Sequence, residues 1–324
     1  MPDSTSQSLQ PPRDARAWDV IGVGANSVDL VAFLPGFPEP AGFFSKMRIR
    51  RELYCCGGQT ATTLAACAAL GLRTKYAGAT GDDENGRRIR AELVRRGVDV
   101  EAAPIRQAPN QHAIILLDER TGERTVLWDR DARLGLEAAE IPLPALGHAR
   151  LLHVDDVDQE AAILAAEHAR TLGLPVTSDL DRMTELTERL VAAVTYPIFA
   201  EGLAGQLTGV ADHERALRKM RERHDGLLCI TIGREGAVAL DGDRFLHSPG
   251  FEVHALDTTG SGDVFRAGFI YALLQGWDAE RTLRFANAAA AVSCTRIGAM
   301  DGVPAWNEIH ELLQRGHQTL IPDS

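Results

Sequence analysis

From Trp18 onward, the sequence alternates short β-type runs with helical stretches, and this alternation constrains the fold more than any other feature. The β-type runs are DVIGVGA, KYAGATG, RLLHVDD, LPVTSDL and LLCITIG. The helical stretches TATTLAACAAL and QEAAILAAEHARTLG close at Gly71 and Gly173, and glycine suits the end of a helix. Such an order predicts an α/β fold of three layers around a mostly parallel central sheet.

Two regions interrupt this rhythm with extended, strand-like sequence and no convincing helix. They cover about residues 30–56 and 105–134, and the second has a turn signal at Thr121-Gly122. We expect them to pair into a small β-sheet lid that excludes water from a reacting group. Asp241-Gly242 predicts a further hairpin in the last third of the chain.

The net charge and the hydropathy of the chain limit its possible cellular compartment and binding partners. The net charge of −11 disfavours binding to nucleic acid or to an anionic membrane. No apolar stretch approaches the roughly 20 residues that span a bilayer, and the N-terminus lacks a signal-peptide core. The five cysteines show no zinc spacing, which favours reduced thiols. We therefore expect a cytoplasmic protein with a disordered tail over residues 1–16 and one domain over residues 17–320.

The stretch DTTGSGDVFRAGFIYALLQG, residues 257–276, is the strongest chemical signal. Its glycines precede an apolar helix, so several backbone N–H groups can point at one anion. A carboxylate placed there suits work on the proton of an incoming nucleophile. We predict that Asp263 is a general base and that Gly260, Ser261 and Gly262 form an anion hole for a transferring phosphoryl group.

DTTGSGDVFRAGF resembles the C-terminal signature of the ribokinase-like (PfkB) carbohydrate kinases. The stretch GGQTATTLAACAALGLRTKYAGATGDDENGRRIRAELVRRGV resembles the other signature of that family, and the resemblance spans about residues 18–305. It implies a ribokinase-like fold and an ATP- and Mg²⁺-dependent kinase that phosphorylates a sugar hydroxyl. GERTVLW and RLLHVDDVD look like the ketohexokinase branch, while FAEGLAGQLTG and CTRIGAMDGVP look like sulfofructose kinases. A ketohexose, either fructose or sulfofructose, is the implied acceptor.

The resemblance also assigns roles to individual positions. On the sugar side it points to Asp29, Gly57, Gly58, Gln59 and Lys46, where Lys46 matches a lysine that binds a sulfonate. On the ATP side it points to Thr231, Gly233, Gly236 and Asn287. The NxxE segment of the family reads Ala200-Glu201-Gly202-Leu203 here, so Glu201 is the acidic residue left to handle magnesium and phosphate. Asp257 and Thr259 match positions that hold potassium in some relatives.

Two other functions stay open at this stage. The altered NxxE segment is compatible with a non-catalytic sensor of sugars or nucleotides, and a wider apolar acceptor pocket would suit a nucleoside kinase. Asp179 and Asp181 are second-rank candidates for a water-mediated magnesium contact. His153, Asp155, Asp156 and Asp158 resemble a metal cluster, but we favour a role in lining a cleft or satisfying backbone groups. The strands of the lid predict a homodimer formed through it.

Overall fold

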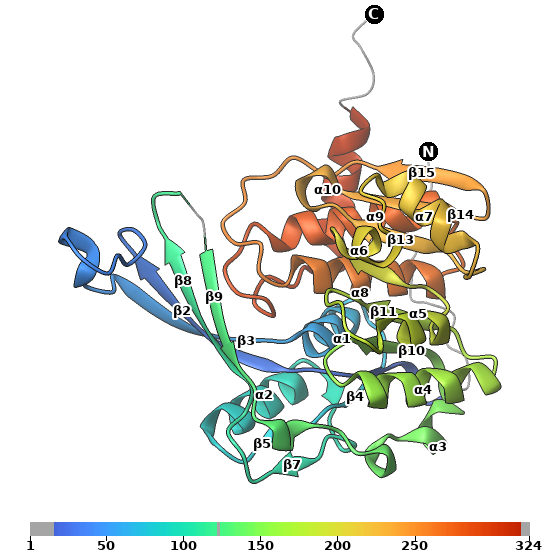
Figure 1. Ribbon diagram of the computed structural model, residues 1–324, viewed down its shortest axis with the longest axis horizontal. Helices are drawn as coiled ribbons and strands as arrows, with labels where there is room; N and C mark the ends of the chain where they lie inside the picture. The colour runs from blue at the N-terminus through green and yellow to red at the C-terminus, as the bar shows by residue number, and fades with distance from the viewer. Residues whose placement is uncertain (1–15, 122–123, 319–324) are drawn as a thin grey trace, which may run out of the picture.

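The structure, a computed structural model, describes residues 16–121 and 124–318 (Figure 1). The expected tail over residues 1–16 therefore lies, except for Arg16, outside the described residues, as does Gly122 of the expected turn. The predicted class is confirmed, because helices cover both faces of a mostly parallel sheet and a smaller sheet projects from one side (Figure 1).

The central sheet consists of two hydrogen-bonded blocks. The first is fully parallel, in the order β11-β10-β1-β4-β6, and the second has the order β12-β13-β14-β15. Bridges from Thr177 to Tyr196 and from Leu180 to Phe199 join β11 to the segment of β12. The bounds are β1 Trp18–Val23, β4 Thr74–Ala77, β6 Val98–Asp99, β10 Ala149–Asp155, β11 Val176–Asp179, β12 Ile198–Ala200, β13 Leu228–Thr231, β14 Ala237–Asp241 and β15 Arg244–Ser248. β14 and β15 form the hairpin predicted at Asp241-Gly242.

The helices fall into two layers because successive strand residues point to opposite faces. On one face, Val20 and Leu151 pack with helices α1 Gln59–Ala69, α2 Glu84–Arg95, α8 Ser261–Leu274, α9 Ala279–Ser293 and α10 Trp306–Gln318. On the other face, Ile21 and Leu152 pack with α3 Leu143–Leu146, α4 Gln159–Thr171, α5 Thr187–Ala193, α6 Leu203–Thr208 and α7 His213–Arg221. No helix in the described part of the chain is long and apolar enough to cross a membrane.

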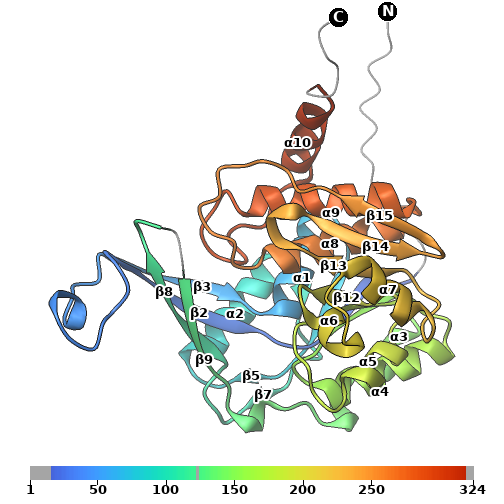
Figure 2. The same cartoon turned by 45° about the horizontal axis from the view of Figure 1, so that its top comes forward.

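The small sheet leaves the body as a four-stranded arm in the order β3-β2-β8-β9 (Figures 1 and 2). Its bounds are β2 Ser27–Leu34, β3 Arg51–Gly57, β8 His112–Asp118 and β9 Arg124–Asp129. Val31, Phe33, Ala113 and Ile115 are buried on its inner face, the face that also carries Asp29. A further two-stranded sheet pairs β5 Thr80–Gly81 with β7 Ile105–Arg106. We refer to the four-stranded arm as the lid sheet.

Candidate active site

The N-terminus of α8 places Asp263 where two helices meet. Gly260 caps the helix with a φ of 77°, a left-handed conformation that favours glycine. A side chain at Gly260 would also stand 2.6 Å from Cβ of Ala299. The backbone oxygen of Asp263 accepts a hydrogen bond of 3.1 Å from Oγ1 of Thr63 in α1. The predicted anion hole therefore lies at a helix start and beside the first turns of α1.

The carboxyl group of Asp263 lies against two buried charged side chains. Asp179, the last residue of β11, interacts with it directly, and Nη2 of Arg266 lies 2.6 Å from Oδ1 of Asp179. Burial raises the pKa of Asp263 well above its usual range, the negative charge of Asp179 raises it further, and Arg266 opposes the shift. The sequence alone did not reveal the role of Arg266, although an arginine in an otherwise apolar helix could have signalled a buried partner.

On the sugar side, the structure brings together Asp29, Gly57 and Gly58. Asp29 accepts a hydrogen bond of 2.5 Å from Oγ of Ser27, and a side chain at Gly57 would stand 3.0 Å from Oδ2 of Asp29. Burial raises the pKa of Asp29. Gly58 has a φ of 95°, and a Cβ there would collide with the backbone of Asn26. Gln59 is the first residue of α1, so it lies next to this cluster.

Asp155 holds the backbone beside this cluster in place through hydrogen bonds. Its Oδ2 accepts hydrogen bonds from the amide of Ala25 at 2.7 Å, from Oγ1 of Thr60 at 2.8 Å and from the amide of Thr60 at 3.3 Å. Its Oδ1 accepts one from the amide of Val157 at 3.0 Å. Asp155 thus joins the end of β10 to the β1–β2 connection and to the start of α1. This is the backbone-satisfying role favoured from the sequence.

The neighbouring polar residues also bond within the protein. Nδ1 of His153 lies 3.0 Å from Oγ1 of Thr177, and burial lowers the pKa of His153 to about 3. Asp156 accepts hydrogen bonds from the amides of Asp181 and Arg182. Over the described residues, no three His, Cys, Asp or Glu side chains are arranged to hold a metal ion.

A cavity of about 970 Å³ opens on the other side of the α8 N-terminus. Its walls include Gly233, Gly236 and Asn287 from the predicted ATP side and Ser261 from the anion hole. Asn287 donates hydrogen bonds to the backbone oxygen and Oγ of Ser248, at 2.8 and 3.0 Å, so it holds the wall of the cavity together. Thr231 ends β13, and its Oγ1 donates to the backbone oxygen of Phe199 at 3.3 Å.

Arg124 was not anticipated from the sequence. It belongs to β9 of the lid sheet and lines the same cavity, and its Nη1 donates a hydrogen bond to Oγ1 of Thr258. The lid sheet therefore contacts the body on the ATP side as well as the sugar side.

Two predicted residues lie apart from this cluster. Lys46 is exposed in the 35–50 connection, which forms the far tip of the lid sheet in Figure 1, so the structure does not bring it to Asp29 or Asp263. Glu201 is exposed after β12, on the same edge of the central sheet as Asp179 and Asp181. Its predicted role toward phosphate and magnesium stays a prediction.

The loop that follows Thr295 closes the site beside Asp257 and Thr259. Asp257 accepts hydrogen bonds from the amide of Thr259 at 2.9 Å, from Oγ1 of Thr259 at 2.7 Å and from the amide of Gly298 at 2.9 Å. These bonds tie the entry to α8 to the loop that contains Ala299.

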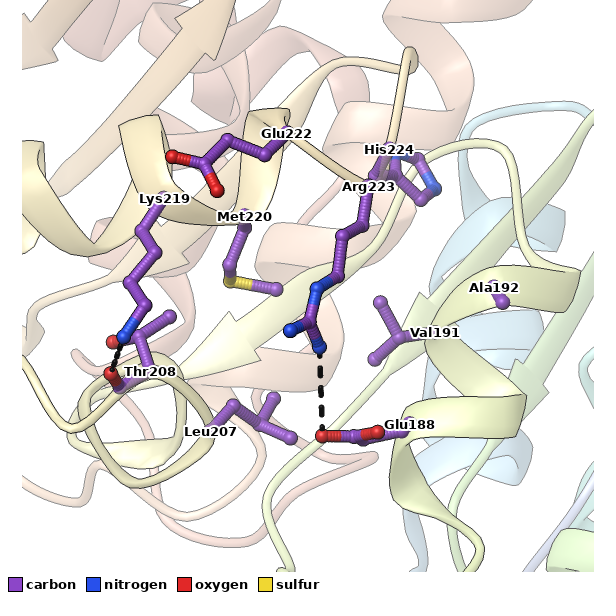
Figure 3. A pocket seen from close by; sticks show the side chains of 10 residues that line it. All are labelled: Glu188, Val191, Ala192, Leu207, Thr208, Lys219, Met220, Glu222, Arg223 and His224. Carbon is purple, nitrogen blue, oxygen red and sulfur yellow. Dashed lines mark hydrogen bonds and ion pairs between the residues drawn. The ribbon is translucent and has the colours of Figure 1, made fainter.

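A second hollow lies away from this constellation, between α5, α6 and α7 (Figure 3). It has a volume of about 360 Å³. In Figure 3, Lys219 points to the backbone oxygen of Thr208, at 2.7 Å, and Arg223 points across to Glu188, at 3.9 Å. None of the residues predicted from the sequence lines it, so the candidate active site is the one at the α8 N-terminus.

Comparison with known proteins shows which chains resemble this one. The sequence profile of the pfkB family of carbohydrate kinases matches residues 19–306. An ATP-dependent ribose-1-phosphate kinase of Halopiger xanaduensis is 31% identical over 284 residues, 86% of this chain and 93% of that protein. A nucleoside kinase of Methanothermobacter thermautotrophicus is 28% identical over 303 residues, 90% of this chain and 94% of that protein. A crystal structure from Agrobacterium tumefaciens, assigned as a ribokinase, has a TM-score of 0.87 and 27% identity and covers 93% of this chain and 99% of its own.

Proposed function

Because the chain belongs to the pfkB family of carbohydrate kinases, we propose that it transfers the γ-phosphate of ATP to a hydroxyl group of a sugar or a sugar-bearing molecule, with Asp263 as the base. One observation carries the proposal. The helix start that holds Asp263 separates the cavity of about 970 Å³ from the cluster of Asp29, Gly57 and Gly58. A nucleotide and an acceptor bound on these two sides would meet at Asp263.

The reaction then needs little covalent chemistry from the protein. The acceptor hydroxyl gives its proton to Asp263 while its oxygen forms a bond to the γ-phosphorus. The bond from that phosphorus to the β–γ bridging oxygen breaks, and ADP leaves. The amides at Gly260, Ser261 and Gly262 stabilise the negative charge of the transferring group, aided by the dipole of α8.

Magnesium fits the donor set at this edge of the sheet. Mg²⁺ on ATP takes most of its ligands from phosphates and water and needs only one or two carboxylates. Glu201 and Asp181 are exposed there, and they would hold the ion, which neutralises phosphate charge. Potassium is a separate part of the proposal, since Asp257, Thr259 and Gly298 form a bonded loop beside the anion hole. Stimulation of ADP release by K⁺ over choline would support it, and equal rates would contradict it.

For the acceptor we propose a ribose-type sugar or a nucleoside in place of fructose or sulfofructose. The names of the two relatives above point to ribose-1-phosphate and to nucleosides. Lys46, which the sulfofructose kinase resemblance matches to a sulfonate-binding lysine, lies at the lid tip. Trp128, 61% exposed on the Asp29 face of the lid sheet, could cover a base. A panel of ribose, ribose-1-phosphate, nucleosides, fructose and sulfofructose, read by ADP release, tests this assignment. Fructose or sulfofructose as the best acceptor would overturn it.

The kinase mechanism itself is tested by Asp263→Asn. This change keeps the size of the side chain and removes the base, so kcat should fall by at least ~10²–10⁴-fold. Ser261→Ala, two positions before Asp263 in the same helix start, is the matched comparison and should reduce kcat much less, because the backbone amide remains. Near-full activity of Asp263→Asn would contradict the mechanism. Binding of ATP and acceptor without turnover in the unmodified protein would instead favour the sensor.

We also propose that two copies pair through the outer face of the lid sheet, the face opposite Asp29. Tyr54, Ile114 and Leu127 share that face and are 53%, 40% and 53% exposed. Large exposed apolar side chains grouped on one face mark contact surfaces. Leu127→Glu should convert a dimer to a monomer in light scattering, whereas Leu172→Glu, on α4's exposed end, should not. A monomeric unmodified protein would refute the pairing.

A further inference from the structure

Two charged side chains lie buried directly beneath the proposed base. Asp179 and Arg266 are each 3% exposed, and their carboxyl oxygen and guanidinium nitrogen are 2.6 Å apart. Burying an ion pair is expensive in free energy and is often no more stabilising than an apolar pair of the same size. Stability alone therefore gives no good reason for this pair, and its location calls for another explanation.

The location is set by the helix period and by the sheet edge. Arg266 follows Asp263 by three positions in α8, so both side chains leave the helix on the same side. Asp179 is the last residue of β11, and Ile198 begins the adjacent β12. Arg266 thus reaches from α8 to the carboxyl end of the central sheet, where its Nη2 also lies 3.5 Å from the backbone oxygen of Ile198.

The same guanidinium lies under the anion hole. A Cβ placed on Gly262 would stand 2.9 Å from Nη1 of Arg266, so the glycine backbone rests on this side chain. The carboxyl of Asp179 contacts Arg266 on one side and the carboxyl of Asp263 on the other. The contacts therefore run from Gly262 to Arg266, from Arg266 to Asp179, and from Asp179 to Asp263. Both ends of this series lie in the first turn of α8, which carries the amides and the base.

On the basis of the proposed kinase function, we infer that Asp179 and Arg266 are a positioning pair. Arg266 supports the glycine loop and fixes Asp179, and Asp179 fixes the rotamer of Asp263 against the acceptor hydroxyl. The pair acts through Asp263 and the glycine loop, and neither of its side chains is assigned a contact with the acceptor or the phosphoryl group. Loss of the pair should lower kcat and leave the binding of ATP and acceptor intact, because a displacement of about 1 Å at a reacting group can reduce the rate ~10²-fold.

The decisive variant is the double substitution Asp179→Asn with Arg266→Met. It removes both charges of the pair and keeps the volume, so neither partner of the pair is left as an unpaired buried ion and the protein should keep its fold. We expect its Tm to match or exceed that of Arg266→Met alone, which leaves Asp179 without its cation. We expect its kcat to stay ~10–10²-fold below the unmodified enzyme with both KM values within about threefold. Arg266→Lys, which keeps the charge, should recover part of the lost kcat.

Three results would overturn the inference. Recovery of full kcat in the double variant would show that the pair serves stability alone. An increase in the KM for ATP with unchanged kcat would assign the pair to nucleotide binding. Restoration of Asp179→Asn by excess Mg²⁺ would make Asp179 a residue that serves the metal.

A matched control separates a local effect from general destabilisation. Arg150 and Asp19 form a partly buried ion pair, with 3.3 Å between Nη1 and Oδ1, at the opposite end of the parallel strands, where Arg73 also bonds Asp19. Arg150→Met should lower Tm and leave kcat unchanged. If Asp263→Asn kept its activity, the proposed function would fail before the pair was tested, so the two failures are distinguishable.

Discussion

Replacing Asp155 with alanine should destabilise the protein more than any exposed change near the site. Asp155 is completely buried, and its two oxygens accept hydrogen bonds from three backbone amides and one hydroxyl. Bonds to a charged group contribute about 1.5–3 kcal/mol each, and a donor left unsatisfied costs about 1–3 kcal/mol. The bonds at 2.7 and 2.8 Å should dominate, because the bond to the Thr60 amide is long at 3.3 Å.

Burial of the carboxylate offsets part of this gain, and burial is the main cause of the raised pKa of Asp155. We therefore expect a net loss of about 3–5 kcal/mol, a large share of the roughly 5–15 kcal/mol that stabilises a typical domain. Urea unfolding followed by circular dichroism measures it. Asp155→Asn should lose less, since its amide oxygen keeps one set of donors. Asp181→Ala, exposed at the same sheet edge, should change stability by less than about 0.5 kcal/mol. A loss below about 1 kcal/mol for Asp155→Ala would refute the argument.

Three further outcomes are expected. Gly58→Ala should lower stability by about 1–3 kcal/mol and raise the acceptor KM in steady-state assays, because φ is 95° and the Cβ collides with Asn26; unchanged values would contradict this. Asn287→Ala should raise the KM for ATP by more than the KM for the acceptor, since it removes the hydrogen bonds that hold the cavity wall at Ser248. The kcat should fall as pH drops, starting above the range of an ordinary carboxyl, because the base must be ionised and its pKa is raised by burial and by Asp179. A profile flat to pH 5 would contradict the last expectation.

Local sequence patterns predicted much of the fold because they depend on neighbouring residues. Gly71 and Gly173 follow their helices with φ values of 86° and 66°, as their sequence position indicated. The hairpin at Asp241-Gly242 forms as predicted, with Gly242 at a φ of 57°. The small sheet was predicted from the strand-like sequence of about residues 30–56 and 105–134. The helix ends and the hairpin turn depend on a few consecutive residues, whereas the small sheet also requires two distant regions to pair.

Features that depend on distant segments could not be derived in the same way. Lys46 precedes Gly58 by 12 positions in the sequence. The connection between β2 and β3, however, runs outward to the lid tip, so Lys46 lies away from Asp29 and Asp263. An arginine in the apolar helix α8 could have signalled a buried carboxylate, yet the chain has 45 Asp and Glu residues, and only the folded structure selects Asp179 as the partner of Arg266. Arg124, at the start of β9, reaches Thr258 because this end of the strand lies beside the ATP-side cavity. No local sequence pattern predicts that contact.

The charges around Asp263 explain why a kinase site of this kind needs a cation beyond its own residues. Asp29, Asp155, Asp179 and Asp263 all lie near the start of α1 or α8, and burial raises the pKa of each. Arg266 is already paired with Asp179, so its positive charge is largely neutralised within the protein. The dipoles of the two helices supply only about half a positive charge each. Arg124 and Arg234 line the nucleotide cavity, but at the start of α8 the transferring phosphate would approach these acidic side chains, and magnesium bound to the phosphates would offset the repulsion.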